Sequence, residues 1–177
     1  MDVSLAGRTA VITGGSKGIG LAIATRFAAS GADVAIVARG REALDDAVKT
    51  VGVNGRRVVG VQGDVALAAD VKRAYDEIMK ALGKIDIVVN NAGTSATGPF
   101  EKLTDEFLQH DLDQKLFAAI RLTRLVWPQM KERRWGRIHQ CAQHRRQGAA
   151  RRQRADFDHP RSRHGADQGA LARRRAA

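Results

Sequence analysis

The stretch "VITGGSKGIG" (Val11–Gly20) decides how this chain folds. It lies between a β-rich run, "RTAVIT" (Arg8–Thr13), and a helical pattern, "GIGLAIATRFAASG" (Gly18–Gly31). Glycines let the backbone turn sharply and approach a phosphate closely, while the following helix directs free N–H groups and its positive dipole end to the same place. The stretch therefore predicts a phosphate-binding strand–turn–helix unit, and an ordinary glycine-rich connection is the alternative.

Short β-rich runs and longer helical patterns alternate through the front part of the chain. The runs predict strands at residues 8–13, 32–39, 56–64 and 85–90, and the patterns predict helices at 18–31, 42–52, 67–84 and 103–136. "GRI" after the last helix starts a fifth strand. This rhythm indicates βαβ units with right-handed crossovers, so the predicted fold class is α/β with a doubly wound parallel sheet.

Two of these helices show an apolar face at helical spacing. It is formed by Ile19, Ile23 and Phe27 in the first, and by Val71, Tyr75, Ile78 and Leu82 in the third. In the long last helix we expect Thr104 to be the N-cap and Pro128 to cause a break or kink.

The glycines follow a spacing of their own, T-G-x-x-x-G-x-G, from Thr13 to Gly20. "GDV" (Gly63–Val65) follows the third strand, "NNAG" (Asn90–Gly93) follows the fourth, and "WPQM" precedes "GRI". In this order and spacing the motifs resemble the short-chain dehydrogenase/reductase (SDR) family, over Leu5 to Ile138. The resemblance implies a Rossmann fold that binds NAD(P)(H).

The resemblance also implies coenzyme-binding roles, residue by residue. The pyrophosphate and the adenosine ribose would be surrounded by Gly14, Ser16, Lys17, Gly18 and Ile19. Asp64 would accept a hydrogen bond from the adenine amino group, and Val65 would lie against the ring. The nicotinamide-side ribose would lie beside Asn91, Ala92 and Gly93, whereas Asn90 would tie neighbouring strands together.

The end of the second strand indicates which dinucleotide is preferred. An acid there would accept both ribose hydroxyls and repel a 2′-phosphate, but the chain has Ala38 and then Arg39. Arg39 offers a planar cation to a phosphate, and Lys17 supplies a second positive charge. We therefore predict NADP(H) rather than NAD(H), with solvated surface charges as the alternative role of these two residues.

The catalytic residues implied by the resemblance are missing. SDR reductases, such as 3-oxoacyl reductases, move a hydride between the coenzyme and a small-molecule carbonyl or alcohol substrate, using a Ser, a Tyr-x-x-x-Lys pair and a helix Asn. The sole tyrosine, Tyr75, fits a core face, no lysine follows Lys131, and the helix asparagine position is occupied by Lys115. We expect an SDR oxidoreductase by ancestry whose present chain is inactive; a non-catalytic nucleotide-binding remnant is the alternative.

Residues 139–177 differ from the rest in composition. They hold 10 basic and 3 acidic side chains, against 20 and 16 in residues 1–138, and four of the five histidines. The histidine spacing fits no metal site, and neighbouring arginines would repel a cation. A basic arm for nucleic acid is an alternative, but Phe157 is the only aromatic residue available for base stacking.

A one-nucleotide frameshift explains the change after Ile138. Read one base later, codons for His139, Gln140 and Cys141 can encode Ile, Asn and Val, which continues the family's strand. The predicted division is an incomplete Rossmann domain at 1–138 and an out-of-frame tail at 139–177. The sheet would then lose its central fifth strand, fourth-strand residues such as Ile87 and Val89 would lose cover, and the family's oligomer interface would be lost.

The remaining features predict a cytoplasmic protein. The N-terminus has no basic segment before an apolar run, so we expect no signal peptide, and no stretch approaches the roughly 20 apolar residues of a membrane span. A single cysteine, Cys141, excludes an internal disulfide framework.

Overall fold

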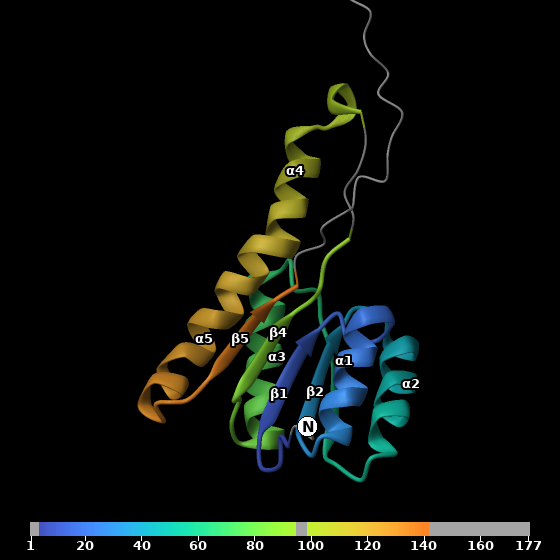
Figure 1. Cartoon of the computed structure of the whole chain (residues 1–177). Helices are drawn as coiled ribbons and strands as arrows, with labels where there is room; N and C mark the ends of the chain where they lie inside the picture. The colour runs from blue at the N-terminus through green and yellow to red at the C-terminus, as the bar shows by residue number, and fades with distance from the viewer. Residues whose placement is uncertain (1–3, 95–98, 142–177) are drawn as a thin grey trace, which may run out of the picture. The chain divides into compact units, whose positions relative to one another are not determined.

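Five parallel strands form one sheet in the order β3-β2-β1-β4-β5 (Figure 1). The computed structural model describes residues 4–94 and 99–141. The strands are β1 (Thr9–Thr13), β2 (Asp33–Ala38), β3 (Val58–Gln62), β4 (Ile87–Asn90) and β5 (Arg137–Gln140). This order confirms the doubly wound Rossmann-type sheet predicted from the sequence.

Helices cover both faces of the sheet. α1 and α2 pack on one face, and α3 and α5 on the other. The helical elements are α1 (Gly18–Ala29), α2 (Arg41–Gly52), α3 (Ala68–Leu82), the 3₁₀ turn η1 (Phe100–Lys102), α4 (Asp105–Leu112), the π-helical turn η2 (Asp113–Phe117) and α5 (Ala118–Glu132). No helix among the described residues has the length and apolarity that crossing a bilayer requires.

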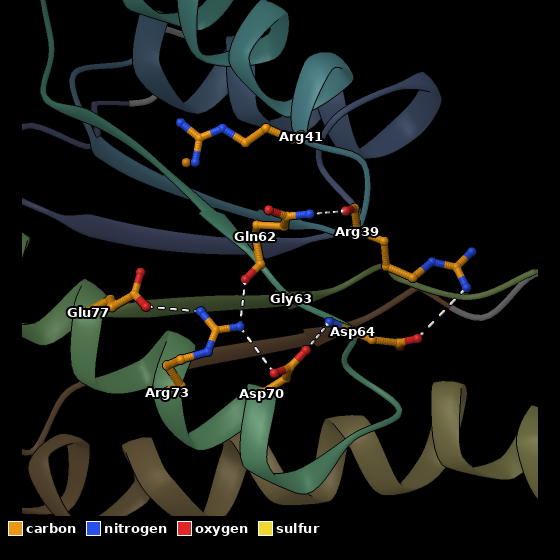
Figure 2. Close-up of a pocket in the computed structure, with 9 residues that line it drawn as sticks. Arg39, Arg41, Gln62, Gly63, Asp64, Asp70, Arg73 and Glu77 are labelled. Carbon is orange, nitrogen blue, oxygen red and sulfur yellow. Dashed lines mark hydrogen bonds and ion pairs between the residues drawn. The ribbon is translucent and has the colours of Figure 1, made fainter.

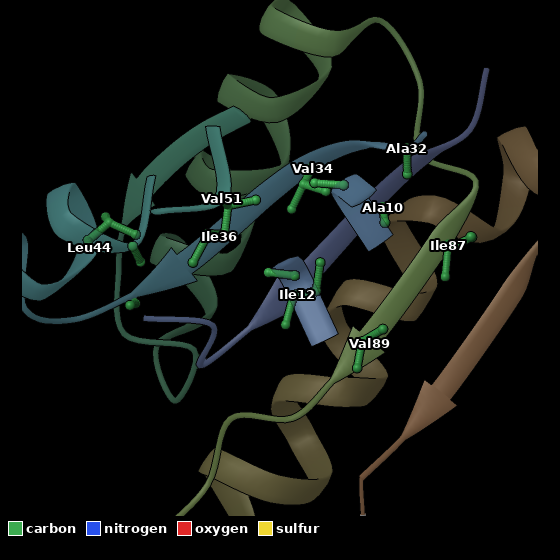
Figure 3. Packing of buried hydrophobic residues seen from close by; sticks show 13 residues of the cluster. Ala10, Ile12, Ala32, Val34, Ile36, Leu44, Val51, Ile87 and Val89 are labelled. Atoms are coloured by element: carbon green, nitrogen blue, oxygen red, sulfur yellow. The ribbon is translucent and has the colours of Figure 1, made fainter. Parts of the chain in front are cut away.

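The strands alternate their side chains between two cores, because successive residues of a strand point to opposite faces. Figure 3 shows the core under α1 and α2, which includes Ile12, Ile36 and Val89. Val11, the neighbour of Ile12, belongs instead to the core under α3 and α5. Both faces are therefore apolar, as a parallel sheet covered by helices requires.

The sequence signals in the long last helical segment agree with the structure at its start and not at its proline. Thr104 Oγ1 accepts a hydrogen bond from the Phe107 N–H at 3.3 Å, which confirms the predicted N-cap. α5 continues through Pro128 to Glu132, so the helix is not broken there.

The predicted apolar face of α1 was right only in part. The residues that α1 buries are Gly20, Ala24 and Ala28, whereas Ile19 is 69% exposed. Small side chains let the helix lie close to the sheet and leave no room for larger ones. Ile23 and Phe27 pack at the margin of this core, where they are partly buried.

The fifth strand that "GRI" was expected to start is present, although its loss was expected if residues 139–177 are out of frame. β5 pairs in parallel with β4, placing His139 opposite Val89 and Gln140 opposite Asn90. A strand ladder is made by main-chain groups, so the polar side chains do not prevent it. All four β5 residues are exposed, yet Val89 is only 2% exposed, because it packs in the core under α1.

Ile87 is likewise 3% exposed, so neither residue loses its cover. Residues 142–177 lie outside the described part of the chain, and the proposed division at residue 138 stays a prediction.

Candidate functional site

A cavity of about 380 Å³ lies where the strand order reverses, beyond the carboxyl ends of the adjacent strands β1 and β4. In open α/β sheets this switch point is where ligands bind. Four separate segments bring ten of the eleven predicted coenzyme residues into the cavity wall: Gly14, Ser16, Lys17, Ile19, Arg39, Asp64, Val65, Asn91, Ala92 and Gly93. The exception is Gly18, which does not line the cavity.

The glycine turn can only be built with glycine at key positions. Gly14 has φ +66°, a conformation that other residues rarely adopt. A Cβ on Gly20 would collide with the Gly14 carbonyl oxygen and lie 2.5 Å from Asn91 Nδ2. The turn and the first turn of α1 are therefore packed directly on the end of β4.

The N-terminus of α1 is open to an anion. Its N-cap is Lys17, whose side chain makes no capping hydrogen bond, and the first turn contains no acidic residue. The first N–H groups of a helix have no partner within the helix, and they carry the positive end of its dipole. This arrangement favours a negatively charged ligand at the turn.

Asn91 ties the end of β4 to the end of β1 and to the glycine turn. Asn91 Nδ2 donates to the carbonyl oxygens of Thr13 at 3.0 Å and Gly14 at 3.1 Å. Thr13 Oγ1 in turn accepts from the backbone N–H groups of Asn91 and Ala92, both at 3.1 Å. Asn90 is 6% exposed within β4, and the structural role expected for it stays a prediction.

The loop after β3 fixes Asp64. Asp64 Oδ1 accepts from the Ala66 N–H at 2.9 Å, and the Asp64 N–H donates to Asp70 Oδ2 at 2.8 Å (Figure 2). That backbone bond, followed by the Arg73 guanidinium, lowers the pKa of Asp70 below its ordinary value. Asp70 therefore stays ionised at neutral pH and holds the Asp64 loop in place.

Arg39 is an exposed cation in the wall of the site. Its side chain is 59% exposed, and its guanidinium is 3.9 Å from Asp64 Oδ2, a distance too long for a hydrogen bond (Figure 2). Its backbone is held more firmly, because Gln62 Nε2 donates to the Arg39 carbonyl oxygen at 2.9 Å. A weak, exposed ion pair costs little to break, so the guanidinium can turn towards an incoming anion.

Sequence reasoning missed the contribution of the π-helical turn η2. Gln114, which is 5% exposed, reaches the cavity wall and accepts from Thr94 Oγ1 at 3.2 Å. Arg121 joins η2 to the loop after β3, because it pairs with Asp113 at 2.9 Å and donates to the Ala66 carbonyl oxygen at 2.7 Å. No residue spacing distinguishes a π turn from the α-helix around it, although such turns are frequent at functional sites.

Tyr75 lies away from this cavity. It is half-buried on α3 against the core under α3 and α5, and its Oη is 3.4 Å from Gln129 Nε2. This position agrees with the core role predicted from the sequence. Lys115 lines a neighbouring hollow with Asn91 and Gly93.

Comparisons with known proteins agree with this geometry. A family model described as short chain dehydrogenase matches residues 8–142. Oxidoreductase asL5 of Sarocladium schorii is 46% identical over 102 residues, covering 58% of this chain and 40% of that protein. Ketoacyl reductase HetN of Nostoc sp. is 33% identical over 135 residues, covering 76% of this chain and 47% of its own.

A solved structure is similar as well. L-sorbose reductase from Gluconobacter frateurii, complexed with NADPH and L-sorbose, matches with a TM-score of 0.75 and 40% identity. The match covers 78% of this chain and 53% of that one. The chain thus spans about half the length of the relatives it matches.

Proposed function

The chain belongs to the short chain dehydrogenase family, and on this premise we propose that it binds NADP(H) in the cavity beside β1 and β4. The observation that carries the proposal is the uncapped N-terminus of α1 above the glycine turn. The pyrophosphate binds there, held by Gly14, Ser16, Lys17 and Ile19 of the cavity wall, with Gly18 as the first residue of the helix. The fit is physical as well as positional, since the first turn of α1 offers amide donors and no acid that would repel the ligand.

The other coenzyme contacts follow the remaining wall of the cavity. Asp64 accepts from the adenine amino group, and Val65 packs against the ring. Asp64 Oδ1 is already bonded to Ala66, which leaves Oδ2 as the acceptor for adenine. The nicotinamide-side ribose lies beside Asn91, Ala92 and Gly93, whose backbone is fixed by Thr13 and by the glycine turn.

Arg39 is the residue that selects NADP(H) over NAD(H). β2 ends at Ala38 without an acid, and the Arg39 guanidinium is exposed and lies 3.9 Å from Asp64 Oδ2. A 2′-phosphate that draws the Arg39 guanidinium towards itself also breaks the ion pair between Arg39 and Asp64 Oδ2. Binding the phosphate therefore frees the carboxylate that adenine uses.

The bound coenzyme supplies or accepts a hydride, which gives an oxidoreductase acting on a small-molecule carbonyl or alcohol. In this chain we propose binding without appreciable turnover, because its one tyrosine, Tyr75, is held by the core. A Ser with Tyr-x-x-x-Lys is absent from the sequence. Binding without turnover is also what the second candidate function, a non-catalytic nucleotide-binding remnant, predicts, so the two candidates differ only in whether any hydride transfer occurs.

Calorimetry with NADPH and NADH tests the coenzyme proposal. We expect NADPH to bind more tightly than NADH, and Arg39→Ala to weaken NADPH binding by about tenfold while leaving NADH binding unchanged. Arg26→Ala removes an exposed charge from the last turn of α1 and serves as the control. Equal affinities for the two coenzymes in the unmodified protein would contradict the preference.

Turnover is measured separately, as NADPH oxidation with ketone, sugar and steroid carbonyl compounds. Binding without oxidation supports the proposal, whereas oxidation above the rate without protein would show that other residues supply the proton.

A further inference from the structure

Lys115 stands at the junction of two hollows and has no role in the function described so far. The hollow beside α5 has a volume of about 600 Å³ and shares Asn91, Ala92 and Gly93 with the coenzyme cavity. A ligand that extends along the first cavity from Arg39 reaches the second at Gly93. We propose that Lys115 is a positioning residue that binds the nicotinamide-side ribose diol, an inference that rests on the coenzyme binding proposed above.

The π-helical turn η2 gives Lys115 this position. Consecutive residues of the turn face different hollows, Gln114 the coenzyme cavity and Lys115 the hollow beside α5. The Lys115 stem lies against Gly93, because a Cβ built there would be 3.3 Å from Lys115 Cγ and 3.7 Å from Cε. The absence of a side chain on Gly93 therefore brings the lysine up to the strand end where the two hollows meet.

Asp111 holds the ammonium group in place. Lys115 Nζ is 2.6 Å from Asp111 Oδ1, one helical turn earlier. Asp111 Oδ1 is buried and has no hydrogen-bond partner of suitable geometry among the described residues. The positive charge of the Lys115 ammonium group therefore compensates the negative charge of this carboxylate. An ammonium group has three N–H donors, and the pairing with Asp111 engages one of them, which leaves two donors for a pair of neighbouring hydroxyls.

Charge predicts a second property of the site. The nicotinamide ring is positively charged in NADP⁺ and neutral in NADPH, so a nearby cation opposes the oxidised form. Lys115 should therefore raise the affinity for NADPH relative to NADP⁺. The other cation of this hollow, Arg124, lies about two and a half helical turns further along and should have little effect on either form.

The test compares whole coenzyme with adenosine 2′,5′-bisphosphate, which lacks the nicotinamide half. In calorimetry, Lys115→Met should weaken NADPH binding by about tenfold or more, leave the bisphosphate affinity unchanged and reduce the preference for NADPH over NADP⁺. Lys115→Arg, which keeps the cation and its pairing with Asp111, should restore most of the NADPH affinity. Arg124→Met is the matched control and should change none of these values.

Three results would overturn the inference. Lys115→Met could bind NADPH as tightly as the unmodified protein, or it could lose NADPH and bisphosphate affinity equally, which indicates a structural role. Failure of the unmodified protein to bind either ligand would instead reject the coenzyme proposal itself, and the inference with it. Far-UV circular dichroism of each variant shows whether it is folded before it is titrated.

Discussion

Asn91 fixes the position of Gly14, because its side-chain Nδ2 donates to the Gly14 carbonyl oxygen at 3.1 Å. The same nitrogen donates to the Thr13 carbonyl oxygen at 3.0 Å. One amide group therefore joins the end of β4 to the start of the glycine turn. The two sides of the coenzyme cavity are held in register by this side chain.

Asn91→Ala should lower both stability and coenzyme affinity. It removes the donor from two carbonyl oxygens in a partly buried place, which should cost about 1–3 kcal/mol in the free energy of unfolding. Urea unfolding measures this cost, and calorimetry measures the affinity. Asn54→Ala is the control, because it removes a single side-chain bond at the end of α2, far from the cavity. An unchanged unfolding free energy for Asn91→Ala would show that the bridge contributes nothing.

Gly20→Ala should destabilise the protein by about 3 kcal/mol, since the new methyl group has no space beside Gly14 and Asn91. The shift needed to relieve the collision also moves the glycine turn, so coenzyme affinity should fall. Gly52→Ala is the comparison, because nothing lies within 4 Å of a Cβ at Gly52, and its effect should stay within about 0.5 kcal/mol or stabilise slightly. Equal effects of the two changes in urea unfolding would refute the close packing of α1 on β4.

Asp33 should make stability depend on pH. Burial raises the pKa of its carboxyl group, but hydrogen bonds and charge from Arg57 outweigh burial and lower the pKa below the ordinary value. A depressed pKa means that the ionised group stabilises the folded state above the ordinary carboxyl pKa of about 3.9, and that this contribution disappears as pH falls through the folded value. Asp33→Asn should therefore cost about 1–3 kcal/mol at about pH 7.

The difference between Asp33→Asn and the unmodified protein should shrink on acidification to about pH 3, as measured by urea unfolding. Asp46→Asn is the exposed control, since its side chain is 70% exposed and its ion pair with Lys49 contributes little. A difference that grows at low pH would have the wrong sign for this carboxylate.

In the gene, the neighbouring reading frame after codon 138 should be open and should encode a reductase-like sequence. Sequencing the locus and translating the three frames checks this, with the frame of residues 1–138 as the internal reference. An interrupted neighbouring frame, full of stop codons, would reject the frameshift hypothesis and leave the basic tail as a feature of the protein.

The order of strands and helices could be predicted because each element has a local signal. The alternation of apolar runs and helical patterns predicted β1 to β4, and Thr104 marked the start of α4. The buried face of α1 could not be predicted from periodicity. Ile19 has the right spacing, but Gly20 is the residue that the approach of α1 to β4 requires.

Site residues could be predicted where a strand or turn ends, and not where a side chain crosses to another element. Asn91 was predicted to lie beside the ligand, but the hydrogen bonds of its amide to the glycine turn were not predicted. Gln114 was missed because its place in the cavity depends on the π turn η2. β5 formed despite its polar residues, because main-chain pairing with β4 does not depend on them.

β5 also has a consequence for handling the protein. Among the described residues nothing pairs with its outer side, so its amide and carbonyl groups form a free border of the sheet. Such a border can recruit an extended segment from another molecule and start aggregation. Arg137 places an exposed positive charge on this border and repels a like copy, so low-salt buffers should keep the protein dispersed for longer than high-salt ones.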